Sequence, residues 1–377
     1  MSRRLWWWLV LFCALVVMAP RAMAQRPPET HPTDEHRDIV MTWDRSAMPG
    51  DIVLMPPRTL LAYDHVDLGK RYGELHLTCV SDSSAERGRC PVEGIEDPDT
   101  GLRSIALTFV EQRSQMHTEL SIRGGVERAL SSRACLGDYW QLGIMAPWST
   151  YFNVCPGAEP AGIGAQLALE MPELGKLVAG IWTATLELRA NTPDARNLAT
   201  YTYRFTLTIT DYDAVSIYLP EFQEAAPTVG LNLSYDPIAR TVGGRAHLDM
   251  CLYDGLGSQS EYLGVTVRDS GTRRPGPTGY SVWHTDGGSD DGQRVDYTVT
   301  LDHNGARIPM RNGVEEQLRN IDTARLRLVM LPGMTQPVFC VPTPLTLDTP
   351  RVPIDEKRSG AYQGDLKVEL RLPTSRP

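Results

Sequence analysis

The sequence lacks the short motifs that mark the common enzyme classes. It contains no G-x-S-x-G nucleophile elbow, no H-E-x-x-H motif, no Walker loop and no dinucleotide-binding glycine fingerprint. Its cysteines and histidines also lack the C-x-x-C and H-x-x-x-H spacings typical of zinc sites. We therefore expect no catalytic residue, no metal and no cofactor. Scattered carboxylates still leave a glycoside hydrolase open, because its acid pair has no fixed sequence spacing.

Long apolar runs are also scarce. The apolar stretch at residues 5–17 is shorter than the roughly 20 residues that cross a bilayer. It follows Arg3 and Arg4 and precedes an A-x-A site at residues 22–24, which is the anatomy of a signal peptide. We predict that residues 1–24 are removed on export and that the mature chain begins at Gln25.

Positive charge is in deficit. The formal net charge is −9, and residues 1–24 carry three arginines and no acid, so the mature chain carries −12 (−9 minus 3). Such a charge argues against nucleic acid or anionic lipid as a general partner, because both are themselves negative. A local basic pocket is compatible with it.

Six of the seven cysteines remain once Cys13 leaves with the signal peptide. An even number in an exported protein indicates disulfides, although sequence alone does not fix their pairing. Proximity along the chain favours three pairs: Cys79 with Cys90, Cys135 with Cys155, and Cys251 with Cys340. The last pair would close a loop of roughly 90 residues, worth about 4 to 5 kcal/mol in the chain-entropy model.

Short alternating apolar runs between turn residues predict an all-β protein. Glycine and proline total 60 of 377 residues (32 plus 28), and helical periodicity is scarce. The clearest strand is residues 201–210, where Tyr201, Tyr203 and Phe205 alternate with threonine and arginine. The mature chain, 353 residues long (377 minus 24), exceeds one compact core. Its turn spacing is typical of two tandem immunoglobulin-like β-sandwich domains.

We expect the domain boundary at residues 223–228, a polar linker containing alanine and proline. The first domain would then span residues 25–222 and end with a strand at 217–222. The second would span residues 229–377. Residues 25–37 are rich in proline, histidine and acid, so we expect them to form a solvated leader.

Two local patterns give further predictions. The Pro56-Pro57 pair is expected to separate a strand at residues 52–55 from another at 60–63. Val314, Leu318 and Ile321 have helical spacing, and we predict a short helix there.

An aromatic cluster lies between Cys135 and Cys155. In one interpretation, rings such as Trp140 form a platform that stacks on a sugar. In the other, which we favour, Trp140, Trp148 and Phe152 fill the core of the first domain, because buried aromatics dominate core energetics.

Arginines concentrate in or beside predicted loops of the first half: Arg103, Arg113, Arg123, Arg128, Arg133 and Arg196. A guanidinium can hold a carboxylate through two hydrogen bonds, which a lysine cannot. For any single arginine, however, an exposed ion pair with a neighbouring glutamate is the commoner role.

Two stretches of the second half carry a family resemblance. They are the run DMCLYDG at residues 249–255 and the terminal strand at residues 360–372. Together with the strands at 199–211 and 217–222, they resemble the CblD-like initiators, the minor tip subunits of class 5 fimbriae. The resemblance spans most of the mature chain.

This resemblance implies an outer adhesin domain and an inner pilin domain that lacks its last strand. A periplasmic chaperone, and then the N-terminal extension of the next pilin, would supply that strand after delivery to an outer-membrane usher. The protein would be exported through the periplasm to the fimbrial tip at the cell surface. Its adhesin domain would bind an acidic host glycan, with Arg103, Arg113, Arg133, Arg196 and Trp140 as candidate ligand-binding residues.

The leader adds a hypothesis about assembly. A donor segment must alternate apolar side chains, and residues 25–37 do not. The protein would therefore accept a strand but donate none, which suits the first member of a fibre. A structural initiator that binds no receptor is the competing hypothesis, and a secreted carbohydrate-active enzyme is a third.

Overall fold

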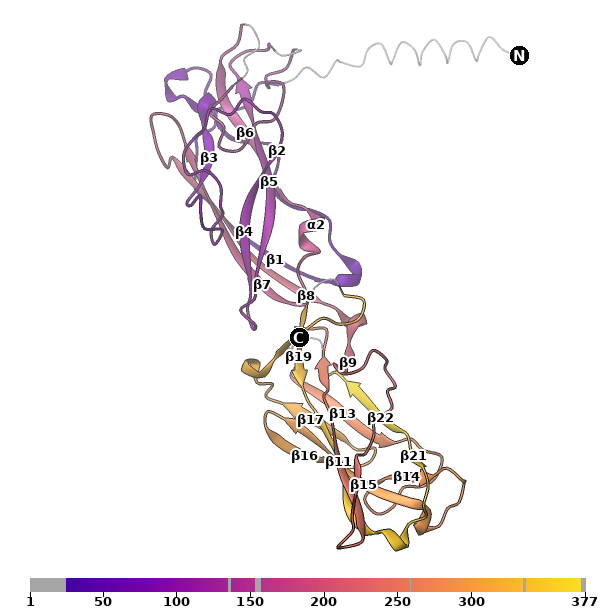
Figure 1. Cartoon of the computed structure of the whole chain (residues 1–377). Helices are drawn as coiled ribbons and strands as arrows, with labels where there is room; N and C mark the ends of the chain where they lie inside the picture. The colour runs from indigo at the N-terminus through magenta and orange to yellow at the C-terminus, as the bar shows by residue number, and fades with distance from the viewer. Residues whose placement is uncertain (1–24, 135–136, 153–156, 258, 335–336, 374–377) are drawn as a thin grey trace, which may run out of the picture.

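The computed structural model describes residues 25–134, 137–152, 157–257, 259–334 and 337–373 (Figure 1). Strands dominate these residues, and their α-helix, α2 (Met171–Leu174), has one turn. No helix in these ranges is long and apolar enough to span a membrane. Short 3-10 helices connect several strands: η1 (Arg45–Ala47), η2 (Leu68–Lys70), η3 (Tyr72–Glu74), η5 (Tyr212–Ala214), η6 (Asp291–Gln293), η7 (Thr323–Arg325) and η8 (Ile354–Glu356).

The first domain is a sandwich whose sheet closes over its own apolar side chains. One layer contains β1 (Glu35–Asp44), β8 (Ala199–Thr210), β7 (Gly180–Asn191) and β3 (His76–Cys79). The other contains β4 (Arg103–Glu111), β5 (His117–Leu130), β6 (Pro160–Leu169) and β2 (Ile52–Tyr63). Two residue pairs between β4 and β7 join the layers. The rings of Phe109 and Phe205 meet across the core with centroids 5.3 Å apart.

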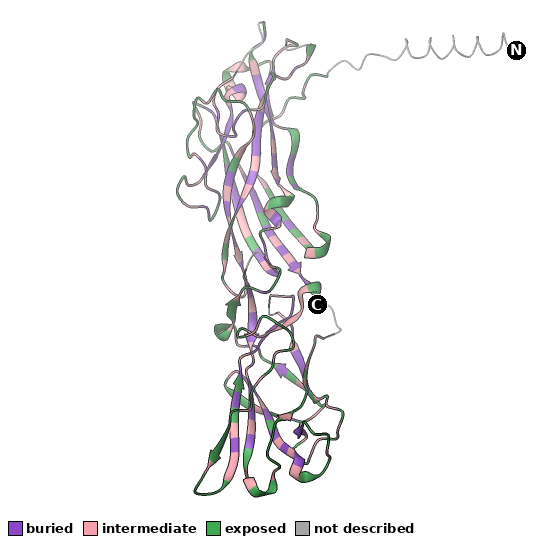
Figure 2. Cartoon of the chain, turned by 45° about the vertical axis from the view of Figure 1, so that its right-hand side comes forward, coloured by how far each residue is buried: buried purple, intermediate pink, exposed green. Residues whose placement is uncertain are grey.

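Sequence alternation decides which face of each strand is buried. In β8, Tyr203, Phe205 and Leu207 are almost fully buried, whereas Arg204 between them is exposed. Figure 2 shows buried and exposed positions alternating along strands of both domains. The predicted strand at residues 201–210 is therefore confirmed, and it begins two residues earlier.

The prediction of two strands around Pro56 and Pro57 is wrong. β2 runs through both prolines as one strand and absorbs them in irregularities of its pairing with β6, while Arg58 adopts a φ of 60°. β2 lies at an edge of the sheet, where a proline costs no hydrogen bond to a second neighbour. Proline therefore bends this strand without ending it.

The predicted leader is too long, because residues 35–37 belong to β1. β1 pairs in parallel with β8 over ten residues, from Glu35 opposite Tyr201 to Asp44 opposite Thr210. Even before β1, Thr30 exchanges backbone hydrogen bonds with Tyr63. The sequence resembles a loop there because the first four residues of β1, Glu35 to Asp38, are all polar.

The remaining described strands form three sheets. The largest holds β10 (Leu233–Asp236), β11 (Thr241–Leu248), β20 (Leu345–Pro353), β15 (Arg294–His303), β14 (Tyr280–His284) and β21 (Tyr362–Gln363), with β16 (Ala306–Met310) beside β15. The second holds β18 (Arg327–Val329), β19 (Val338–Pro342), β12 (Cys251–Tyr253) and β9 (Ser216–Tyr218). The third holds β17 (Glu315–Arg319), β13 (Tyr262–Asp269) and β22 (Leu366–Arg371). Their inner faces share one apolar core.

One element prediction in this region is wrong. The expected helix around Leu318 is the strand β17, in which Leu318 lies opposite Leu263 of β13. A spacing of four residues, as between Val314 and Leu318, fits one face of a strand as well as one face of a helix. The strand expected at residues 217–222 is observed as the shorter β9, which pairs with β12.

The two domains are in direct contact. The amide of Asp211 donates to the carbonyl of Gly255 at 2.7 Å, and Gln259 reaches the carboxylate of Glu111 at 3.5 Å. Gly255 has a φ of +67°, and a Cβ there would lie 2.3 Å from the carbonyl oxygen of Asp211. Glycine therefore permits the close approach of the two backbone segments, one around Gly255 and the other around Asp211.

Disulfides join Cys79 to Cys90 and Cys251 to Cys340 in the structure, as chain proximity favoured. Both Cys251 and Cys340 are fully buried. The proposed Cys135–Cys155 pair lies outside the described residues.

Candidate functional site

A cavity of about 530 Å³ lies in the first domain at the end of β7. β7 starts at Gly180, which adjoins Gly257 of the second domain, and ends at Asn191 beside the cavity. The cavity is therefore remote from the domain junction. Its lining residues are Glu74, His76, Val92, Glu93, Gly94, Glu96, Thr150, Tyr151, Phe152, Asn191, Thr192, Pro193 and Arg196.

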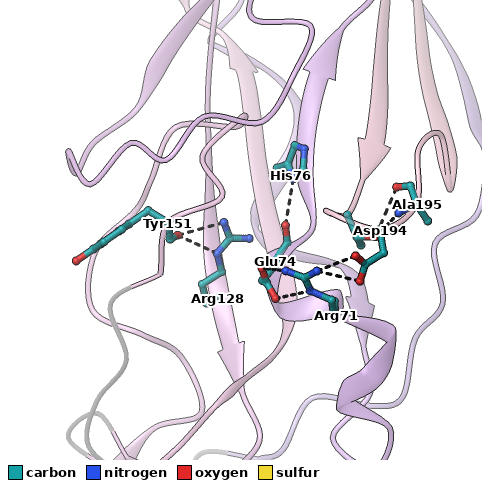
Figure 3. Close-up of polar contacts among 8 residues, drawn as sticks. Arg71, Glu74, His76, Arg128, Tyr151, Asp194 and Ala195 are labelled. Carbon is teal, nitrogen blue, oxygen red and sulfur yellow. Dashed lines mark hydrogen bonds and ion pairs between the residues drawn. The ribbon is translucent and has the colours of Figure 1, made fainter.

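Arg71 ties two walls of this cavity together (Figure 3). Its guanidinium donates to both carboxylate oxygens of Glu74, at 2.7 and 2.6 Å, and to Asp194 at 2.9 Å. The Glu74 and Asp194 carboxylates raise the pKa of Arg71 above its usual value. Because Glu74 lies in η3 and Asp194 in the loop after β7, these bonds fix one wall against the other.

Arg128 is a fully buried cation behind the same walls. It donates to the backbone carbonyls of Leu75, Ser149 and Tyr151, which belong to two different loops. Figure 3 shows the contact with Tyr151. Among the described residues, no carboxylate forms an ion pair with it. Burial lowers the pKa of Arg128 to about 10, so the side chain still carries its charge at neutral pH. Backbone dipoles thus take the place of a counter-ion.

His76 and Gly94 form a close contact in the cavity wall. Nδ1 of His76 lies 3.1 Å from the carbonyl oxygen of Glu74, and burial lowers the pKa of the imidazole of His76. A Cβ on Gly94 would lie 2.6 Å from Nε2 of His76 and 2.5 Å from Thr150. The loop at residues 92–96 can therefore rest on His76 only with glycine at this position.

The predicted binding residues are not brought together. Arg196 lines the cavity and pairs with Glu93 at 2.9 Å. The others lie elsewhere: Arg103 pairs with Asp99 at 3.7 Å, Arg113 donates to the carbonyl of Ile321 in the second domain, Arg133 lies over the ring of Tyr139, and Trp140 packs beneath Arg58.

No sequence pattern pointed specifically to Arg71, Glu74 or His76. Arg128 belonged to the wider group of loop arginines, but nothing in its sequence context indicated that it would be buried. Of the predicted aromatic cluster, Tyr151 and Phe152 line the cavity, whereas Trp148 packs partly buried against the main core of the first domain.

A second feature is the free edge of β22. Among the described residues β22 pairs only with β13. Its inward side chains Leu366, Val368 and Leu370 pack on the domain core but remain half-buried. At the opposite edge of the same sheet, Leu318 of β17 is only 1% exposed. The core is therefore less well covered along β22 than along β17.

Comparisons with known proteins identify relatives that match most of the chain. Two family models match, those of the first and second domains of CfaE, the E subunit of CFA/I fimbriae, over residues 20–212 and 215–374 respectively. The CFA/I fimbrial E subunit of Escherichia coli is 29% identical over 307 residues, covering 79% of this chain and 80% of the relative.

Solved structures show the same fold. The crystal structure of CfaE, the adhesive subunit of the CFA/I fimbria of enterotoxigenic Escherichia coli, is 26% identical with a TM-score of 0.66, covering 92% of this chain and 95% of that one. A chaperone–tip adhesin complex described for CFA/I fimbriae biogenesis matches with a TM-score of 0.63 at 24% identity, covering 93% and 99%.

These relatives are named as fimbrial subunits and not as enzymes. They confirm the resemblance to class 5 tip subunits and the expected two-domain β fold. The first family model alone spans half of the sequence. The chain therefore belongs to the CfaE family, the E subunits of CFA/I-type fimbriae.

Proposed function

We propose that this protein is the tip adhesin of a fimbria, which starts fibre assembly and binds a host-cell receptor. The observation that carries the proposal is the free edge of β22, with its half-buried Leu366, Val368 and Leu370. An unpaired strand beside an incompletely covered core is stabilised when a strand from another chain pairs with it. That strand would come first from a periplasmic chaperone and then, at the outer-membrane usher, from the next pilin.

The inner pilin domain and the outer adhesin domain divide between Thr210 and Ser216 in this proposal, earlier than the linker expected at residues 223–228. What supports this division is the pairing of β9 with β12. The adhesin domain then ends with β8, whose last residue is Thr210.

The proposed receptor is an acidic glycan bound in the cavity, with Arg196 holding its carboxylate. The side chains of Arg196 and Glu93 are 80% and 67% exposed, so their ion pair contributes at most about 1 kcal/mol. A ligand carboxylate can replace Glu93 and accept two hydrogen bonds from the guanidinium. The rings of Tyr151 and Phe152 offer apolar faces to a sugar.

Strand acceptance is tested with the N-terminal peptide of the major pilin of the same fimbria. Added to the mature chain, the peptide should raise the melting temperature, because it covers the half-buried side chains of β22. A peptide of the same composition with its alternation scrambled is the control. The replacement Val368→Asp should abolish the effect. A wild-type chain whose melting temperature does not respond to the peptide would contradict the proposal.

Receptor binding is tested on a glycan array that contains sialylated glycans and their asialo counterparts. Arg196→Ala should weaken binding of the sialylated set, whereas Arg103→Ala, outside the cavity, should not. Equal binding by both variants would remove Arg196 from the site. A chain that accepts the strand yet binds no glycan would favour the structural initiator, and glycan turnover would favour the enzyme.

A further inference from the structure

A second cavity, of about 290 Å³, lies in the second domain, and we call it the distal pocket. It is lined by residues 271–273, 281, 283–285 and 363–365. β21 pairs with β14 at only two positions, after which Gly364 and Asp365 carry the chain across to β22. One wall of the distal pocket therefore leads directly into the strand with the free edge.

The distal pocket is built with tight backbone packing. A Cβ on Gly364 would lie 2.8 Å from the carbonyl oxygen of Ser281, so this wall requires glycine. His284 is held between Asp286, at 2.9 Å, and the carbonyl of Ser359, at 3.1 Å. The pocket is thus preformed and does not need a partner to shape it.

Arg273 gives the distal pocket an available cation. Its guanidinium lies 5.0 Å from the centroid of Trp283 and donates to the carbonyls of Gly288 and His284. Arg294, on the same ring at 5.6 Å, already pairs with two aspartates. Asp365 also lines the pocket, but no carboxylate among the described residues forms an ion pair with Arg273. An incoming carboxylate could therefore pair with this guanidinium beside an aromatic ring.

The position along β22 indicates which partner meets this pocket. β22 ends at Arg371, opposite Gly264, near the start of β13, and β13 follows Gln259, which contacts Glu111 of the first domain. β22 begins at Leu366, opposite Asp269, at the other end. The first domain therefore occupies one end of the free edge. The folded body of a pilin whose strand lies along β22 must lie beyond the other end, where the distal pocket opens.

We propose that the distal pocket seats the segment that joins the donor strand of the next fimbrial pilin to its folded body, with an acidic side chain of that segment on Arg273. The proposal rests on the strand-acceptor function proposed above. It adds a contact that the donor strand alone does not make, and so it separates recognition of the whole pilin from recognition of its peptide.

The test compares two probes on the full mature chain, namely the N-terminal peptide of the major pilin and the folded major pilin itself. Arg273→Ala should weaken binding of the folded pilin about tenfold, as expected for a partly desolvated charge pair. The shift in melting temperature caused by the peptide should not change. Thr272→Glu, at an exposed lining position, should give the same loss without removing the guanidinium. Arg245→Ala, an exposed β11 arginine paired with Asp348, is the matched control.

If Arg273→Ala and Thr272→Glu both bind the folded pilin with the wild-type affinity, the proposed role of the distal pocket is refuted, while the strand-acceptor function remains intact. Weaker binding of the periplasmic chaperone, with pilin binding unchanged, would also overturn it. If the peptide does not shift the melting temperature of the wild-type chain, the strand-acceptor function is refuted, and the proposed role of the distal pocket is refuted with it.

Discussion

Replacing Arg128 with methionine should loosen the walls of the cavity at the end of β7. Methionine fills a similar apolar volume but donates no hydrogen bond, so the buried carbonyls of Leu75, Ser149 and Tyr151 lose their common donor. Each such loss costs about 1 to 3 kcal/mol, or roughly 3 to 9 for three carbonyls. Removing a buried charge returns several kcal/mol of desolvation energy. Set against the middle of the first range, about 6 kcal/mol, a return of roughly 2 to 4 kcal/mol leaves a net destabilisation of about 2 to 4 kcal/mol.

Thermal unfolding measures this change. At about 2 to 4 °C per kcal/mol for a domain of this size, the melting temperature should fall by roughly 5 to 15 °C. Arg128→Lys keeps the charge but not the fork of donors, so its melting temperature should lie between those of the wild type and Arg128→Met. If Arg128→Met has the same melting temperature as the wild type, the two loops do not depend on the guanidinium, and the reasoning is refuted.

Three further predictions concern other parts of the chain. Burial lowers the pKa of His76, so only the unfolded state takes up the proton readily, and the wild type should lose stability as the pH falls below about 6.5. Thermal unfolding of His76→Asn should not show this loss. Replacing Cys251 and Cys340 with alanine opens a loop with a sequence separation of 89, and denaturant titration should show about 4 kcal/mol less stability. Gly255→Ala should cost about 2 to 4 kcal/mol and raise hydrogen exchange at the domain junction. Gly287→Ala, with a positive φ but no atom within 4 Å of the added Cβ, should cost only the backbone strain.

Sequence patterns predicted strands well where alternation was long. The strand around Tyr203 was predicted because each core side chain alternates with a polar one over ten residues. Short patterns were ambiguous, and Leu318 was assigned to a helix because two or three positions do not separate a period of 3.6 from one of 2. Edge strands were also predicted poorly, since β1 begins with four polar residues, Glu35 to Asp38, and resembles a loop there.

Most of the cavity could not be predicted from the sequence. It depends on the pairing of β3 with β7, which brings His76 opposite Asn191, more than a hundred positions away. Arg196 was identified from its residue type and its loop position. Arg128 could not be placed, because its partners are backbone carbonyls, which any residue provides and no motif records.

The pairing of β1 with β8 has a consequence for adhesion strength. The described N-terminal strand, β1, is built into the protein's own first sheet and is not available to another copy. In the proposed role each fibre therefore carries a single receptor head, whatever its length. Longer fibres then extend reach without adding valency. Avidity for a cell surface would rise with the number of fibres per bacterium and with the density of the glycan.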